Sequence, residues 1–263
     1  MTNRISVITS TYDSERYIEE NLKSVWNTTK KPFEQVIVDA YSKDNTLKIV
    51  KKYANKYNIR ILKREPKGIP DAMNFGIKNA RGNIIQILHS DDKNINKNIH
   101  RQVDNSFNNQ KTKWVIGLTK SIDENGKTIT TQPHKLFRKY SYLKLILKSF
   151  VPHPSSILRK EVFEKFGYFR DDLKITMDYE FWVRIGKKIR PMMINKPWCA
   201  FRVHQGGAST RASSKVILRE QKKIFRDNLG VIPTFFILPL RWFLSYALVR
   251  LYRIIFPFKN QNK

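Results

Sequence analysis

A short apolar run that ends in two adjacent carboxylates constrains the fold more than any other feature of the chain. Residues 84–88 read Ile-Ile-Gln-Ile-Leu, and His89 and Ser90 lead directly into Asp91 and Asp92. A short β-branched run bounded by polar residues predicts a buried central strand of a parallel sheet, and ligands bind at the carboxyl ends of such strands. Adjacent like charges repel unless a cation lies beside them, so the pair predicts a metal-bound phosphorylated ligand. A plain Asp-rich turn is the competing interpretation.

Apolar strands and amphipathic helices alternate at short spacing through the first third of the chain. We expect strands at residues 5–10, 33–39, 59–62 and 84–88, and helices at residues 15–26, 45–56 and 68–80. Ser14 is the expected N-cap of the first helix. This order predicts right-handed βαβ units in an α/β fold with a mostly parallel central sheet flanked by helices, and it excludes all-α and all-β folds. The loops after Ser10, Asp39 and Ser90 then lie at one edge of the sheet, where a nucleotide would bind.

The pattern is less regular beyond Asp92. We expect strands at residues 114–119, 127–131, 155–158, 189–194 and 198–203. We expect helices at residues 96–107, 140–149 and 213–227, a helix that ends with residues 162–167, and another that begins at residue 178. Residues 204–209, which include two adjacent glycines, are expected to form a flexible loop.

The charge balance narrows the range of partners. The chain has 50 Lys and Arg against 22 Asp and Glu, a formal net charge of +28. Such a field attracts nucleic acid, anionic lipid or phosphorylated substrates, and a solvated basic surface is the competing explanation. The basic residues are scattered and no nucleic-acid-binding motif is present, so no nucleic-acid partner is expected, and a basic nucleic-acid-binding protein without catalysis is the alternative class. The single cysteine, Cys199, fits a reducing compartment, and the N-terminus lacks a signal-peptide pattern.

The tail, residues 231–258, is aromatic and apolar but is interrupted by prolines and arginines. It contains no window of the roughly 20 uncharged residues that a spanning helix needs. Aromatic and arginine side chains instead suit an interfacial helix that lies on an anionic membrane surface. Packing against the domain's own core is the alternative. We therefore expect a cytoplasmic protein, peripheral on the inner face of the plasma membrane.

Four segments in order resemble the family 2 glycosyltransferases of GT-A fold, which are inverting nucleotide-sugar transferases. The resemblance runs from about residue 5 to residue 209. Residues 5–12 resemble the family's opening strand and loop, and residues 36–46 its second strand with a terminal acidic residue. Residues 68–92 resemble its helix and acidic motif, and residues 177–184 the acidic motif that supplies the catalytic base.

The resemblance implies a nucleotide pocket built by five side chains. Thr9 and Thr11 would line it through backbone and hydroxyl groups, and Tyr12 would stack on the base. Asp39 would accept a hydrogen bond from the base, with a turn residue as the alternative interpretation. Asp71, within the helical motif, is counted among the nucleotide-binding residues.

The resemblance also implies the catalytic set. Asp91 would hold the ribose or assist the metal, and Asp92 would coordinate Mn²⁺ or Mg²⁺ on the diphosphate. Asp178 would be the general base, although it is also a plausible helix cap, and Glu180 is the alternative base. His204 is a candidate metal ligand because imidazole binds Mn²⁺, although a single histidine is more often structural.

The implied activity is metal-dependent transfer of a sugar, with inversion, to a hydroxyl of a saccharide acceptor in cell-surface polysaccharide assembly. We expect the acceptor to be lipid-linked. The donor would be a nucleotide sugar, most simply a UDP-sugar. Residues 1–210 would form the GT-A domain, with a Rossmann-like nucleotide-sugar half at 1–110 and an acceptor half at 111–210. Residues 211–263 would form a basic, amphipathic, helical extension that associates with the membrane. Ser90, Tyr12 and Ala40-Tyr41 depart from the family pattern, which bears on donor identity more than on transfer.

Overall fold

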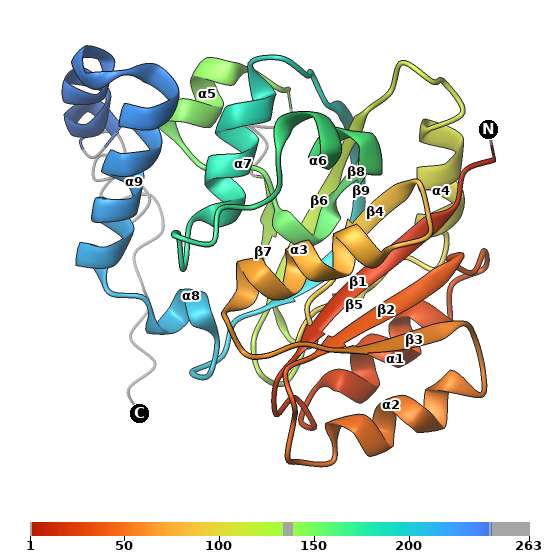
Figure 1. Cartoon of the computed structure of the whole chain (residues 1–263). Coiled ribbons are helices and arrows are strands. Elements are labelled where there is room, and N and C mark those ends of the chain that lie inside the picture. Colours follow the sequence, from red (N-terminus) through yellow and green to blue (C-terminus); the bar gives the residue numbers. More distant parts are fainter. Residues whose placement is uncertain (1, 134–138, 242, 244–263) are drawn as a thin grey trace, which may run out of the picture.

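A single mixed sheet forms the centre of the molecule (Figure 1). The structure is a computed structural model and describes residues 2–133, 139–241 and 243. Within these residues the strands follow the order β3-β2-β1-β4-β8-β6-β9-β5, and β7 pairs with β6. Their bounds are β1 Ile5–Thr11, β2 Glu34–Asp39, β3 Ile59–Lys63, β4 Ile84–Ile87, β5 Lys93–Asn94, β6 Trp114–Ile122, β7 Thr128–Gln132, β8 Ser156–Arg159 and β9 Met192–Arg202.

The predicted parallel half is present. Strands β1, β2, β3 and β4 pair in parallel, so their carboxyl ends meet at one edge. Strand β4 then pairs antiparallel with β8, and β8 antiparallel with β6, so β4 joins a parallel half to a mixed half. The two strands expected at 189–194 and 198–203 are one strand, β9, which is parallel to β6.

Helices cover both faces of the sheet (Figure 1). Their bounds are α1 Ile18–Trp26, α2 Thr46–Ala54, α3 Ile69–Asn79, α4 Ile99–Ser106, α5 Tyr142–Leu147, α6 Lys160–Phe166, α7 Met177–Gly186, α8 Ala208–Arg211 and α9 Ser214–Leu229, with a 3₁₀ turn, η2, at His153–Ser155. Alternate strand residues divide between two cores: Ile8 packs in a cluster with residues of α3, α6, α7 and α9, and Val7 in a cluster with residues of α4. Gly76 lets α3 lie directly on β1, because a Cβ atom there would be 2.4 Å from Cγ2 of Ile8.

The first helix begins later than expected. It starts at Ile18, and Ser14 is not its N-cap. The Ser14 hydroxyl instead donates to the carbonyl oxygen of Tyr12 and accepts from the hydroxyl of Ser90, at 3.2 and 3.0 Å. Ser14 therefore links the loop after β1 to the loop after β4, both at the carboxyl edge of the sheet.

The C-terminal part of the described chain packs on the domain. Helix α9 is followed by a second helix at residues 231–241, and we call these two the C-terminal helices. Ile224 and Phe225 of α9 belong to the main core, and Ile237 and Leu238 pack against it. Among the described residues, no helix is both long and apolar enough to span a bilayer. Residues 244–258 of the expected interfacial tail lie outside the described residues.

Candidate active site

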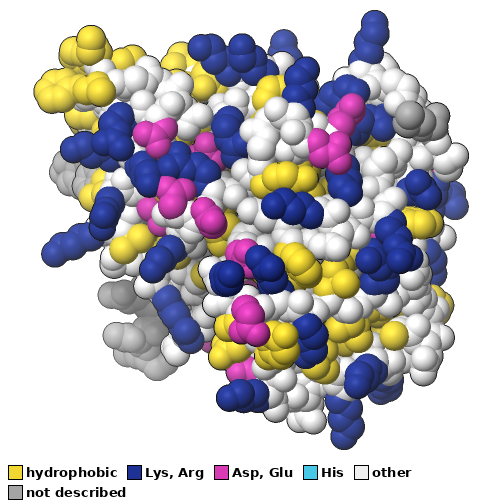
Figure 2. Space-filling view, viewed as in Figure 1, with side chains coloured by type: hydrophobic (Ala, Val, Ile, Leu, Met, Phe, Trp, Pro, Cys, Tyr) yellow, Lys and Arg dark blue, Asp and Glu magenta, His cyan; other side chains and the backbone are white. Residues whose placement is uncertain are grey.

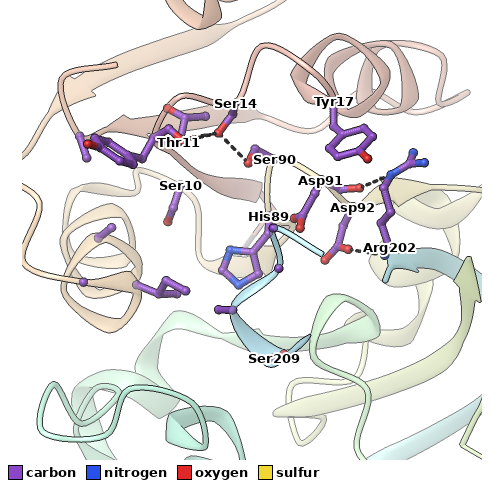
Figure 3. Close-up of a pocket in the computed structure, with 18 of the residues that line it drawn as sticks. Ser10, Thr11, Ser14, Tyr17, His89, Ser90, Asp91, Asp92, Arg202 and Ser209 are labelled. Atoms are coloured by element: carbon purple, nitrogen blue, oxygen red, sulfur yellow. Dashed lines mark hydrogen bonds between the residues drawn. The ribbon is translucent and has the colours of Figure 1, made fainter. Parts of the chain in front are cut away.

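A pocket of about 830 Å³ opens at the carboxyl edge of the parallel strands (Figure 3). Its wall is built by the loops after β1, β2, β3 and β4, the N-terminal turns of α3 and α7, and the segment between β9 and α8. The loop predicted to be flexible at 204–209 forms part of this wall and runs into α8, which the sequence analysis missed. The chain thus brings both halves of the sheet to one cavity.

Arg202, at the end of β9, fixes the acidic loop after β4. Its buried guanidinium donates to the carbonyl oxygen of Asp91 at 3.1 Å, to that of Glu124 at 2.8 Å and to the carboxylate of Glu20 at 2.9 Å. Its backbone N–H donates to Oδ1 of Asp92 at 3.1 Å (Figure 3). Sequence reasoning missed this arginine, because one more basic residue in a basic chain carries no local signal of burial.

Asp92 is a buried carboxylate with an unused oxygen. Asp92 is only 1% exposed, and its Oδ2 atom has no hydrogen-bond partner among the described residues. Burial and the neighbouring charge of Asp91 hold the pKa of Asp92 well above its usual value. An uncompensated charge in such a place is costly unless a cation accompanies it. The residue therefore fits a ligand of a divalent metal.

Asp91 and His204 lie beside Asp92 and complete the polar end of the pocket. Nε2 of His204 is 3.0 Å from Oδ2 of Asp91, and both side chains line the cavity. Over the described ranges, three or more His, Cys, Asp or Glu side chains nowhere gather closely enough to hold a metal by themselves. Mg²⁺ and similar ions commonly take one or two carboxylates and complete their shell with phosphate oxygens and water, which suits this arrangement.

The five side chains expected at the nucleotide divide into two groups. Thr11 and Tyr12 line the pocket. Tyr12 is 62% exposed, so its ring is accessible for stacking. Thr9, Asp39 and Asp71 do not line the pocket. The hydroxyl of Thr9 accepts from Nε2 of Gln35 at 2.9 Å inside the fold, because Thr9 lies two residues before the end of β1 and does not reach the edge of the sheet.

Asp39 is held entirely by the protein. Its carboxylate accepts from Thr11 at 2.9 Å, from Nζ of Lys63 at 2.6 Å and from both the backbone and hydroxyl of Ser42. Burial alone would raise its pKa, but these hydrogen bonds outweigh burial and hold the pKa of Asp39 below its usual value. Direct hydrogen bonding from a base to this carboxylate would have to displace one of these donors.

Asp71 acts on the pocket through Arg64, which sequence reasoning missed. Two hydrogen bonds of 2.8 Å join the guanidinium of Arg64 to the carboxylate of Asp71, and the arginine lines the pocket. Arg64 directly follows β3, so it enters the same sheet edge as the loops after β1 and β4. The position of Arg64 directly after a parallel strand is the sequence signal that could have identified it as a pocket residue. A bidentate carboxylate partner keeps the guanidinium oriented for a planar or anionic ligand.

Asp178 faces the pocket from the first turn of α7. Its side chain is half-buried and Oδ1 accepts from the N–H of Tyr179 at 2.6 Å. Burial raises the pKa of Asp178 to about 6, against the lowering effect of that hydrogen bond. The N-cap of α7 is Thr176, so Asp178 is not the cap. Asp178, Asp91 and Asp92 therefore lie on the wall of one cavity although they are distant in sequence.

Glu180 is directed elsewhere. Its buried carboxylate makes two hydrogen bonds to Arg184, at 2.9 and 2.8 Å, and it does not line the pocket. Of the two carboxylates considered for the base, only Asp178 is placed to meet a ligand.

Two stacked histidines form another part of the wall. The rings of His89 and His153 lie 5.2 Å apart between centroids with an interplanar angle of 13°. Burial and, to a smaller extent, the nearby His89 lower the pKa of His153 to about 3, so the ring of His153 is neutral near pH 7. Both nitrogens of this ring lack partners among the described residues. The sequence analysis left His153 without a role and did not single out His89.

A family comparison agrees with this arrangement. The model described as Glycosyl transferase family 2 matches residues 6–167, more than half of the chain. The chain belongs to this family. The matched region includes the acidic loop after β4 and ends before Asp178, so α7 and the C-terminal helices of this family 2 chain lie outside it.

Individual relatives share part of their length with the chain. An uncharacterized glycosyltransferase of Methanocaldococcus jannaschii is 29% identical over 185 residues, which are 68% of this chain and 63% of that protein. The poly(ribitol-phosphate) beta-N-acetylglucosaminyltransferase TarS of Staphylococcus aureus is 30% identical over 189 residues, which are 69% of this chain and 32% of TarS. The chain therefore spans less than two thirds of the length of each.

Solved structures confirm the GT-A type of α/β fold. TarS 1–349 in complex with UDP-GlcNAc superposes with a TM-score of 0.73 at 23% identity, covering 98% of this chain and 77% of that one. The mannosyltransferase PcManGT of Pyrobaculum calidifontis, in complex with GDP-Man and Mn²⁺, superposes with a TM-score of 0.66 at 17% identity, covering 95% and 76%.

The different surroundings of two buried carboxylates predict opposite effects of neutralising them. Asp92→Asn should raise the melting temperature in metal-free buffer, because the raised pKa of Asp92 means that its charge opposes folding above the usual carboxyl pKa. Asp39→Asn should lower the melting temperature, because the lowered pKa of Asp39 means that its charge supports folding there. Each kcal/mol corresponds to roughly 2–4 °C in a domain of this size.

Thermal unfolding of both variants beside the wild type, in the presence of a chelator, measures these shifts. A lower melting temperature for Asp92→Asn would contradict the interpretation of Asp92 as an uncompensated buried charge. Added Mn²⁺ and nucleoside diphosphate should stabilise the wild type and Asp39→Asn more than Asp92→Asn.

Proposed function

We propose that the chain is a metal-dependent inverting glycosyltransferase that moves a sugar from a nucleotide-sugar donor to a hydroxyl of a saccharide acceptor. The observation that carries the proposal is the shared pocket of Asp178, Asp91 and Asp92. One carboxylate with a pKa near 6 lies on the same wall as a carboxylate that lacks a counter-cation. A proton acceptor and a cation site are the two groups that displacement of a nucleoside diphosphate by an alcohol requires.

Asp178 supplies the proton acceptor. With its pKa at about 6 it is mostly ionised at pH 7, yet it is basic enough to take the proton of an acceptor hydroxyl as that hydroxyl attacks the anomeric carbon. Attack from the face opposite the leaving diphosphate inverts the anomeric configuration. Glu180, the alternative base, accepts two hydrogen bonds from Arg184, which supports Asp178 as the base.

Asp92, Asp91 and His204 would hold Mn²⁺ or Mg²⁺. When bound, the cation neutralises charge that develops on the departing diphosphate oxygen. The protein's own contribution at this end is to fix the loop that carries both carboxylates, through Arg202, and to shield Asp92 from water by burial.

On the donor side we assign Thr11, Tyr12 and Arg64 to nucleotide contacts, with Asp39 and Asp71 holding them in place. The proposed donor is a UDP-sugar, supported by the similar fold of TarS, which was solved with UDP-GlcNAc. We propose that residues 1–110 form the half that binds the nucleotide sugar and that residues 111–210 form the half that binds the acceptor.

A panel of nucleotide sugars tests the proposed activity. The purified protein is incubated with each sugar, Mn²⁺ and saccharide acceptors, and the released nucleoside diphosphate is measured. Release from a UDP-sugar is expected for the wild type, and Asp178→Asn should reduce it by about 10²-fold or more because the general base is lost. Turnover retained by Asp178→Asn would move the base to another group, and the absence of metal-dependent binding of any nucleotide sugar would refute the activity.

The pKa of the base predicts the acid limb of the pH profile. Asp178 must be deprotonated to accept a proton, so kcat/KM should be constant above its pKa of about 6 and fall about tenfold for each pH unit below it. Initial rates from pH 4.5 to 8, with nucleotide binding measured at each pH, give the profile. A limb centred near the ordinary carboxyl pKa would contradict a half-buried base.

For the acceptor we propose a lipid-linked saccharide at the inner face of the plasma membrane. The helix at 231–241 presents an exposed apolar face (Figure 2). Phe235 on this face is 75% exposed. The members of this face are Val231, Ile232, Phe235, Phe236, Leu240 and Phe243. Exposed basic side chains of α9 lie next to it in sequence, at Lys215, Arg219, Lys222 and Arg226. Apolar insertion beside positive charge suits an anionic bilayer surface, which attracts each Lys or Arg by about 1 kcal/mol.

Removing two rings of this face should weaken binding to anionic vesicles. The double variant Phe235→Ser with Phe236→Ser should bind phosphatidylglycerol-containing vesicles at least about tenfold more weakly, because each buried Phe contributes roughly 1.5–3 kcal/mol. Co-sedimentation measures binding, and Ile129→Ser, which removes an exposed apolar side chain from β7, is the matched control. Equal binding by the double variant, or binding to neutral vesicles alone, would sink the proposed surface.

A further inference from the structure

The backbone just before the base helix is held by one carboxylate from the C-terminal helices. Oε1 of Glu220, on α9, accepts from the N–H of Lys174 at 2.7 Å. Oε2 accepts from the N–H groups of Ile175 and Thr176 at 3.2 and 2.9 Å, and from the hydroxyl of Thr176 at 2.8 Å. Three consecutive backbone donors thus converge on a single side chain that is far away in sequence.

Glu220 is ionised in this position although its residue is only 7% exposed. Burial alone would raise its pKa, but the hydrogen bonds from the Lys174–Thr176 backbone and the Thr176 hydroxyl outweigh burial and hold the pKa below its usual value. Its negative charge also lies at the N-terminal end of α7, where the helix dipole favours an anion. Hydrogen bonds to a charged acceptor are about twice as strong as neutral ones, so this attachment is rigid.

The attached segment is part of the pocket wall. Lys174 and Ile175 line the cavity, and Met177 and Asp178 follow them directly on the same wall. The position of Asp178 is therefore set at two places, by the turn of α7 that carries it and by the segment that Glu220 fixes.

A second contact from the C-terminal helices reaches the residue after Asp178. The buried guanidinium of Arg241 donates to the hydroxyl oxygen of Tyr179 at 2.9 Å and to the carbonyl oxygen of Ile146 at 2.7 Å. It also lies over the Tyr179 ring, 4.8 Å from the centroid. The first turn of α7 is thus held from both C-terminal helices.

We propose that Glu220 is a positioning residue for the reaction, with Arg241 as a second support, so that the C-terminal helices act on the reaction through these two side chains. The proposal rests on the proposed role of Asp178 as base. Glu220 touches neither donor nor acceptor, and it acts by keeping Asp178 and the neighbouring wall in the geometry that proton transfer requires. A displacement of about 1 Å in such a group costs up to about 10²-fold in rate.

Glu220→Ala tests the proposal, with Glu220→Gln as the conservative variant and Asp227→Asn as the matched control. Asp227 lies on the same helix and pairs with Arg170 near the surface at 2.7 Å, without contact to residues 174–176. The measurements are amide hydrogen exchange at residues 174–176, the affinity for UDP, and kcat and KM for the donor that the panel identifies.

For Glu220→Ala we expect faster exchange at these three amides, a fall in kcat of roughly 10- to 100-fold, and a change in UDP affinity of less than about twofold. Glu220→Gln keeps one accepting oxygen and the side-chain size, so its exchange rates and kcat should lie between those of the wild type and Glu220→Ala. If Glu220→Ala does not fold, Glu220→Gln provides the test of the proposal. Asp227→Asn should match the wild type in every measurement.

Unchanged exchange at residues 174–176 in both Glu220 variants would overturn the attachment. A parallel loss of UDP affinity and kcat, or an equal loss in Asp227→Asn, would show a general structural role and overturn positioning. Failure of the wild type to transfer any sugar would refute the proposed function, and it would be recognised separately because hydrogen exchange requires no turnover.

Discussion

The buried guanidinium of Arg202 is the contact on which the site most depends. It joins the loop after β4, the turn between β6 and β7 and helix α1 through hydrogen bonds to Asp91, Glu124 and Glu20. A buried charge is tolerated only with partners, and here the side chain of Arg202 is satisfied by three carbonyls and one carboxylate. Asp92 receives only the backbone N–H, so the loop is ordered while the Asp92 charge remains uncompensated. Arg202 thus orders the loop and leaves Oδ2 of Asp92 without a hydrogen-bond partner among the described residues, which is the basis of the proposed cation site.

Three carboxylates around one pocket differ because their surroundings differ. Asp39 has a lysine and hydroxyl donors, which hold its pKa low and make it a permanent anion that fixes its loop. Asp178 has one backbone donor and a half-buried side chain, which brings its pKa to about 6 and suits proton transfer. Asp92 has burial and a like-charged neighbour, which raise its pKa and suit a metal. Groups of one chemical type are separated into different tasks by environment alone.

The parallel half of the fold and the position of the acidic loop were predictable because both follow from local pattern. Strand β9 was divided in error at Pro197, which lies where the register between β6 and β9 shifts, the place where a sheet tolerates proline. Thr9 was misplaced because the sequence pattern does not show how far along β1 the pocket reaches: Ser10 and Thr11 line it, whereas Thr9 is buried within the sheet. Arg64 and Arg202 were missed because orientation by Asp71, and burial among loops, are properties of tertiary contacts.

The C-terminal helices show why the tail could not be assigned as an appendage from composition. The helix at 231–241 packs on the core along one side, which is the second alternative drawn from the sequence, and exposes an apolar face on the other, for which membrane association stays a proposal. The same helix carries Arg241, whose guanidinium is buried against Tyr179. The surface that we propose for membrane binding and the contact that holds the first turn of α7 therefore lie on the same helix. Under our proposal, the orientation of the chain on a membrane and the orientation of Asp178 within the pocket are therefore linked through this helix.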